Sequence, residues 1–223
     1  MLAPLGNRCQ NATRRVSVAL AMGGLLAVSS IACSSSGPPP PVAQRSYAED
    51  VQAKRASKDE YLRTSKDSPI PADKRAAFTG LPYFPADPAY RVPASLTQDR
   101  SGPPVIISLE TSTHGIERMQ RVGTLNFSIG GVGYSLSAFA GAEGLARLFV
   151  PFHDLTNRTE TYGGGRYMNL DRTPTGVYDL DFNSAYHPYC VYNATYECPI
   201  PPPENRLAVA IRAGERLPDG YAK

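Results

Sequence analysis

The last third of the chain concentrates side chains that could bind or transform a ligand. Residues 149–216 mix acidic, aromatic, glycine and proline residues with little periodicity, a texture typical of loops that carry function. Arg166 follows three glycines, so a guanidinium and backbone amides there could receive a carboxylate or a phosphate. The candidate ligand-binding residues are Asp154, Arg166, Asp181, Asn183, Tyr186 and Glu204, with Glu215 as a further acid beside them.

Several interpretations of these residues stay open. One is a loop-lined groove that binds a small polar or anionic ligand. The alternative is a hydrolase-like enzyme that uses the carboxylates and Arg166 in the same cleft. For Arg166 itself we favour a structural role, paired with an acid, because a buried charge needs a partner. Tyrosines crowd the same stretch, either as a binding surface for a sugar, peptide or lipid headgroup or as the rim of a β core.

Known catalytic and metal motifs do not fit. The chain has no GxSxG nucleophile elbow, and its triple glycine lacks the lysine and hydroxyl residue of a phosphate loop. Cys190 and Cys198 lie too far apart for the paired cysteines of a zinc ribbon. His153 is expected at the surface, at the end of a strand. We therefore expect no metal and no cofactor.

The N-terminus reads as a lipoprotein signal. Three arginines precede an uncharged, apolar run from Val16 to Ala32, which ends at Cys33. We expect cleavage after residue 32, acylation of Cys33, and a lipid-anchored protein of the bacterial envelope, facing the periplasm or in the outer membrane. Alternatives are an uncleaved anchor helix or an ordinary signal. Residues 33–46, rich in serine and proline, form an extended tether, and residues 47–223 form a single domain.

Removal of the signal changes the charge and the cysteine count. Three arginines taken from 23 basic residues leave 20, equal to the 20 acidic residues. A domain without net charge has no excess of basic residues to bind the phosphates of a nucleic acid. The expected partners are therefore the membrane, through the lipid, and an unknown small ligand. Only Cys190 and Cys198 then remain as ordinary side chains, and in an exported chain they are candidates for a disulfide. A reduced, buried pair is the alternative.

The elements that must position these residues are mostly strands. Ser46 and Glu49 make a capping-box pattern before a helix over residues 47–63. Apolar residues then alternate with period two over short segments. These segments are 91–96, 119–129, 134–138, 148–152, 178–182 and 207–211, and residues 105–109 form a continuous apolar run. Gly130-Gly131 predicts a hairpin between two of them. The fold class is mainly β, an antiparallel sandwich or partly open barrel with one N-terminal helix.

Three sequence blocks also resemble a known family. They are PFHDLTNRTETYGGGRY, LDFNSAYHPYCVYN and CPIPPPENRLAVAIRAGE, and the likeness extends upstream to FTGLPYFPADPAYRVPA and to the helix with Lys58-Asp59. In this order they resemble the domain of unknown function numbered 1684, over roughly residues 47–216. The family usually has asparagine where His187 stands. The resemblance implies a β-rich fold and a shared site around these blocks, without an established reaction.

Overall fold

The computed structural model describes residues 45–99, 102–141 and 144–218. The expected signal segment, the acylated Cys33 and most of the tether lie outside the described residues. Within them, no helix is long and apolar enough to span a membrane. Helix α1 (Tyr47–Thr64) begins at Ser46, whose hydroxyl accepts from the backbone of Glu49 while the Glu49 carboxylate accepts in return. The predicted capping box and helix are thus confirmed, and α2 (Ala72–Arg75) adds one more turn.

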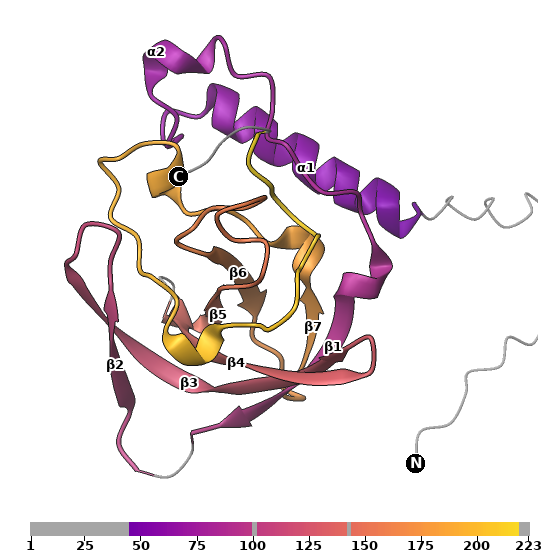
Figure 1. Cartoon of the computed structure of the whole chain (residues 1–223), viewed down its shortest axis with the longest axis vertical. Helices are drawn as coiled ribbons and strands as arrows, with labels where there is room; N and C mark the ends of the chain where they lie inside the picture. Colours follow the sequence, from indigo (N-terminus) through magenta and orange to yellow (C-terminus); the bar gives the residue numbers. More distant parts are fainter. Residues whose placement is uncertain (1–44, 100–101, 142–143, 219–223) are drawn as a thin grey trace, which may run out of the picture. The chain divides into compact units, whose positions relative to one another are not determined.

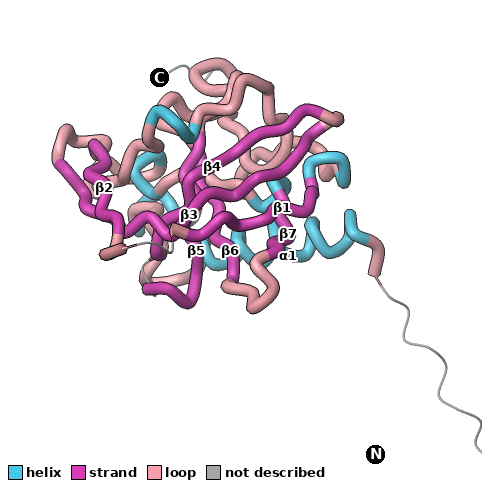
Figure 2. The backbone as a smooth tube through the Cα atoms, turned by 90° about the horizontal axis from the view of Figure 1, so that it is seen from below, coloured by secondary structure: helices cyan, strands magenta, loops and turns pink. Residues whose placement is uncertain are grey.

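A single antiparallel sheet makes up most of the domain. Its strands are β1 (Arg91–Gln98), β2 (Val105–Glu110), β3 (Ile116–Ile129), β4 (Val132–Gly141), β5 (Gly144–Phe152), β6 (Arg166–Asp171) and β7 (Val177–Asp181). They run in the order β6-β5-β4-β3-β1-β7, with β2 paired to β3 beyond this path. The sheet nearly closes into a barrel, which confirms the predicted fold class. Figure 2 shows β2 projecting to the side away from β1 and β7.

The core lies inside the curve of this sheet. Alternate residues of the strands point inward, which is why the period-two pattern predicted them. The fully buried members include Leu125, Leu136, Leu148, Val150, Phe152, Met168 and Leu180. The predicted hairpin is confirmed: Ile129 pairs with Val132, and Gly130 and Gly131 both have positive φ, as a tight primed turn requires.

The C-terminal segments fill the open side of the barrel. Figure 1 shows the orange and yellow segments inside the curve of the sheet, with α1 lying across them. Short 3-10 helices interrupt these segments at η2 (Phe182–Ser184), η3 (Tyr189–Val191) and η4 (Pro203–Asn205); η1 (Pro88–Tyr90) precedes β1. Asn205 fixes η4 because its side-chain amide donates to the carbonyls of Ser137 and Pro151 and accepts from the Ser137 amide.

Two details of the sequence prediction were wrong. Residues 207–211 do not form a strand, although Leu207 and Ile211 are buried as the pattern required. The segment makes one isolated bridge, between His153 and Arg206, and the Ile211 amide donates to a carboxylate instead of to a sheet. This crossing also buries His153, which we expected at the surface; its side chain bonds Asn157 at 3.1 Å.

Candidate functional site

Arg166 and Asp154 form a buried ion pair. Both side chains are 0% exposed, and Nη2 of Arg166 lies 2.8 Å from Oδ2 of Asp154. The guanidinium also donates to the carbonyls of Ile211, Ala213 and Glu215. Neither residue can line a groove, so their assignment as ligand-binding residues was wrong. The structural role favoured for Arg166 is the one observed: it holds the segment 211–215 against the barrel.

Of the other proposed ligand-binding residues, Asp181, Asn183 and Tyr186 line one small cavity together. Oδ1 of Asp181 accepts from the hydroxyl of Tyr47 at 2.9 Å and from both side-chain and backbone nitrogens of Asn183. Asn183 in turn pairs with the backbone of Asp87. These bonds fasten the start of α1 to the sheet. Glu204 is exposed on η4 and lines none of the cavities described below.

Glu215 is the acidic residue around which the side chains of the candidate site gather. Its side chain is 2% exposed. One oxygen accepts from the ammonium of Lys58 on α1, and the other accepts from the hydroxyl of Tyr192 and the amide of His187, both at 2.8 Å. Three donors therefore hold the Glu215 side chain in place. Lys58 keeps 28% of its side chain exposed, and its ammonium lies 4.8 Å from the centre of the Tyr186 ring.

His187, whose backbone amide donates to Glu215, has a neutral imidazole ring. Burial, with Arg166 and Lys58 nearby, lowers its pKa from 6.5 to about 3. Nε2 accepts from the amide of Tyr162 at 3.4 Å.

A groove of about 910 Å³ opens beside Lys58. Its walls come from the end of α1, the start of β3, β5, β6 and the segment 186–199. Five tyrosines line it: Tyr61, Tyr167, Tyr186, Tyr189 and Tyr196. Tyr186 packs edge-on to Tyr167, which packs edge-on to Phe149, and Tyr189 packs edge-on to Tyr196. Asn169 fixes Tyr186 by donating to its hydroxyl at 2.8 Å. The groove is therefore a pre-formed aromatic surface.

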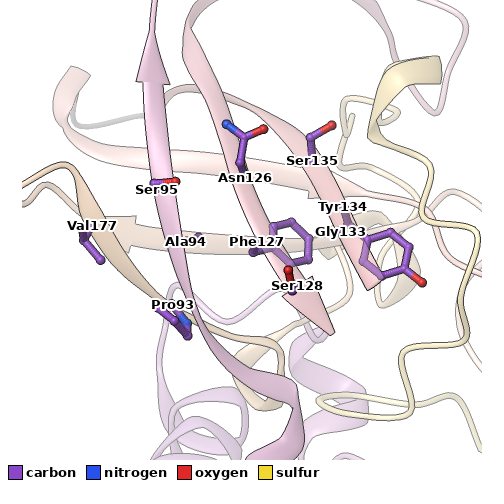
Figure 3. Close-up of a pocket in the computed structure, with 10 residues that line it drawn as sticks. All are labelled: Pro93, Ala94, Ser95, Asn126, Phe127, Ser128, Gly133, Tyr134, Ser135 and Val177. Atoms are coloured by element: carbon purple, nitrogen blue, oxygen red, sulfur yellow. The ribbon is translucent and has the colours of Figure 1, made fainter. Parts of the chain in front are cut away.

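Two further cavities lie elsewhere in the domain. One, of about 180 Å³, lies beneath α1 and shares Lys58 and Tyr186 with the groove. The other, of about 750 Å³, is formed by strands β1, β3, β4 and β7. Figure 3 shows its ten lining residues, and none of them carries a charged side chain. The groove and the small cavity, which meet at Lys58, are thus the candidate site.

The two cysteines lie together as free thiols, and Cys198 lines the groove. The amide of Cys190 donates to the sulfur of Cys198 at 3.3 Å. Hydrogen bonding from Cys198 lowers the pKa of Cys190 to about 7, whereas the same contact and burial raise the pKa of Cys198. The disulfide between them stays a prediction. No three His, Cys, Asp or Glu side chains of the described residues gather as metal ligands.

Comparison with known proteins agrees with the sequence blocks. Residues 76–216 match the family described as "Protein of unknown function (DUF1684)". The chain belongs to the DUF1684 family. The solution NMR structure of an uncharacterized protein from Haloarcula marismortui is 41% identical and superposes with a TM-score of 0.61. The match covers 78% of this chain and 95% of that one. No curated protein matches the chain.

The sequence did not predict which segments form the candidate site. Lys58 and Glu215 are 157 residues apart in sequence and meet only when α1 crosses the C-terminal segment. The sequence contains Lys58-Asp59 in the expected helix and Glu215 among the acids, but no local pattern joins the two positions. Tyr61 gave no signal beyond its place near the helix end. Tyr186 is the one proposed binding residue that does line the groove.

Proposed function

We propose that the protein is an envelope lipoprotein whose domain binds a small polar ligand in the tyrosine-lined groove. The observation that carries this proposal is the wall of five tyrosines around 910 Å³, which also includes both acidic and basic side chains: Lys58, Glu117, Arg118 and Glu197. Tyrosine faces stack on flat, ring-shaped groups, and their hydroxyls offer hydrogen bonds to polar substituents. A sugar or a short peptide of the envelope has this combination of surfaces.

Binding without chemistry is the simpler use of this geometry. The carboxylates and Arg166 that an enzyme would need do not converge: Asp154 and Arg166 neutralise each other inside the barrel. Glu215 is 2% exposed and already accepts from three donors, which leaves one of its roughly four lone-pair positions for a substrate proton. Aromatic side chains fixed by edge-on packing supply a rigid surface, which lowers the entropy cost of binding.

The ligand test uses the full chain in mild detergent. Saccharides and short peptides from the bacterial envelope are titrated, and binding is read as a saturable rise in melting temperature. We expect Tyr61→Ser to weaken binding at least tenfold, because Tyr61 is a 40%-exposed wall residue. The matched control is Tyr134→Ser, which alters the cavity of Figure 3. Equal affinity of both variants, or no shift with any compound, contradicts the proposal.

The anchor needs a separate test. The uncharged, mostly apolar run of 17 residues before Cys33 and the serine, glycine and proline after it are the pattern on which the lipoprotein assignment rests. Acyl chains contribute roughly 0.8 kcal/mol per buried methylene, so more than one chain holds a domain firmly. We expect Cys33→Ala to release the protein from the membrane fraction and to abolish labelling by a clickable fatty acid. A variant that stays in the membrane fraction without label would show an uncleaved helix.

A further inference from the structure

Cys190 and Cys198 are two free thiols that the fold holds against each other. The backbone amide of Cys190 donates to the sulfur of Cys198 at 3.3 Å, and the two side chains are hydrogen-bonded as well. Both pack in a cluster with Leu109, Phe149 and Tyr167, beside the tyrosine-lined groove and apart from the core of the barrel. Side chains in contact in this way can form a sulfur–sulfur bond without a large movement of either backbone.

Other bonds hold each cysteine in place without a disulfide. On one side, the amide of Cys198 donates to the hydroxyl of Ser112 at 3.2 Å, and its carbonyl accepts from the amide of Ser112 at 2.8 Å. On the other side, Cys190 belongs to η3, where the amide of Val191 donates to the carbonyl of Pro188 at 3.0 Å. The form with free thiols is thus a folded state, so the pair can gain or lose a disulfide without unfolding of the domain.

The two thiols differ in exposure and in chemical surroundings. Cys190 is half-buried, whereas Cys198 is 6% exposed. Hydrogen bonds from the side chains of Cys198, Ser112 and Tyr162 lower the pKa of Cys190 to about 7, so about half of it is thiolate at neutral pH. The hydrogen bond to Cys190 and burial raise the pKa of Cys198. Because the thiolate is the reactive form, Cys190 is suited to attack and Cys198 to a second step.

We propose that Cys190 and Cys198 form a reversible redox site that reduces small hydroperoxides, with Cys190 as the attacking thiol and Cys198 as the resolving thiol. The Cys190 thiolate attacks one oxygen of ROOH, the O–O bond breaks, Cys190 becomes a sulfenic acid, and the departing RO⁻ takes a proton to leave as ROH. The sulfur of Cys198 then attacks the sulfur of Cys190. The S–S bond forms, the S–O bond breaks, and the hydroxyl leaves as water with the thiol proton of Cys198.

The two sulfurs together lose two electrons, which the O–O bond gains. A dithiol reductant restores both thiols by thiol–disulfide exchange and itself becomes a cyclic disulfide. The segment that the protein disulfide closes carries Tyr192, which donates to Glu215, and Tyr196, which lines the groove. The redox reaction needs neither a ligand in the groove nor a lipid on Cys33, so it is independent of the proposed function.

The test uses the full chain in mild detergent, with Cys9→Ser and Cys33→Ser so that Cys190 and Cys198 remain of its 4 cysteines. The protein is reduced, freed of reductant and treated with one equivalent of hydrogen peroxide at pH 7. We expect the loss of both thiols, a peptide cross-linked between Cys190 and Cys198 by mass spectrometry, and recovery of both thiols with dithiothreitol. The reduced and oxidised forms should both melt cooperatively. As a control, the two thiols should react at similar rates in urea.

Two single variants separate the two roles. In Cys198→Ser the new hydroxyl keeps a donor beside Cys190, and we expect a sulfenic acid on Cys190 that dimedone traps. In Cys190→Ser we expect at least tenfold less dimedone adduct at the same time. If a variant does not fold, dimedone added with the peroxide to the chain that keeps both cysteines should label Cys190 ahead of Cys198. The proposal is overturned if Cys198 is labelled as fast as Cys190, if no disulfide forms, or if the reduced chain is unfolded, since the disulfide is then a structural bond.

Discussion

Replacing Asp154 by asparagine should reveal how much the buried ion pair with Arg166 contributes to the fold. The change keeps the shape of the side chain but removes its charge and turns one acceptor into a donor. Arg166, 0% exposed, would then be a buried charge without a counterion. Breaking such a pair from one side costs about 3–5 kcal/mol, which is a large part of the 5–15 kcal/mol that stabilises a typical domain.

Thermal and urea unfolding measure this cost. A domain of this size loses roughly 2–4 °C per kcal/mol, so we expect the melting temperature to fall by roughly 10 °C. The matched control is Asp179→Asn, which breaks the exposed pair with Arg91, where the side chains are 46% and 58% exposed. That change should cost less than about 1 kcal/mol. Equal costs for the two variants would refute the reasoning that burial makes Arg166 depend on Asp154.

Three further predictions concern the surroundings of Glu215. Gly214→Ala should destabilise more than Gly131→Ala in urea unfolding: both glycines have φ near +80°, but a Cβ at Gly214 would lie 2.5 Å from the carbonyl oxygen of Ala185, whereas Gly131 has open space around it. The His187 pKa is lowered to about 3, so this group stabilises the fold above its unfolded pKa near 6.5 and loses that contribution as the pH falls. We expect roughly 2 kcal/mol of stability to be lost between pH 7 and 5 through this group, and His187→Asn should flatten that part of the profile. Cys190, half-buried and with a pKa of about 7, should react with iodoacetamide faster than Cys198, with a midpoint near pH 7 by mass spectrometry; similar rates for both thiols would contradict this assignment.

The strands were predictable from sequence because the barrel has one buried face. In β3, Leu125 and Phe127 point inward and Asn126 points outward. Because alternate positions are buried, apolar and polar residues alternate along the strand, and the sequence shows this period. β6 was missed because it is covered on both sides: Arg166, Tyr167 and Met168 are all buried in succession. A polar residue that is buried by an ion pair breaks the pattern from which strands are predicted.

The site was harder to predict than the fold because it depends on contacts between distant segments. Arg166 and Asp154 look functional in sequence, since a glycine run and an acid suggest an anion site. Their roles are decided by the carbonyls of residues 211–215, which lie about 50 residues further along the chain. Tyr61 shows the converse: nothing in its helical sequence marks it, and only the fold places it in the wall of the groove.

The buried pair and the candidate site form successive layers of one arrangement. Arg166 holds the carbonyls of Ala213 and Glu215, and Gly214 lets the chain between them pass within contact of Ala185. The Glu215 side chain is thereby fixed under α1, where it accepts from Lys58 at the border between the groove and the small cavity beneath α1. Residues that look catalytic in the sequence thus act through backbone placement. Their substitution should weaken binding only as far as it displaces Glu215 and Lys58. Both the stability of the fold and the affinity for the ligand should therefore fall in Asp154→Asn, whereas in Tyr61→Ser the affinity should fall without a matching loss of stability.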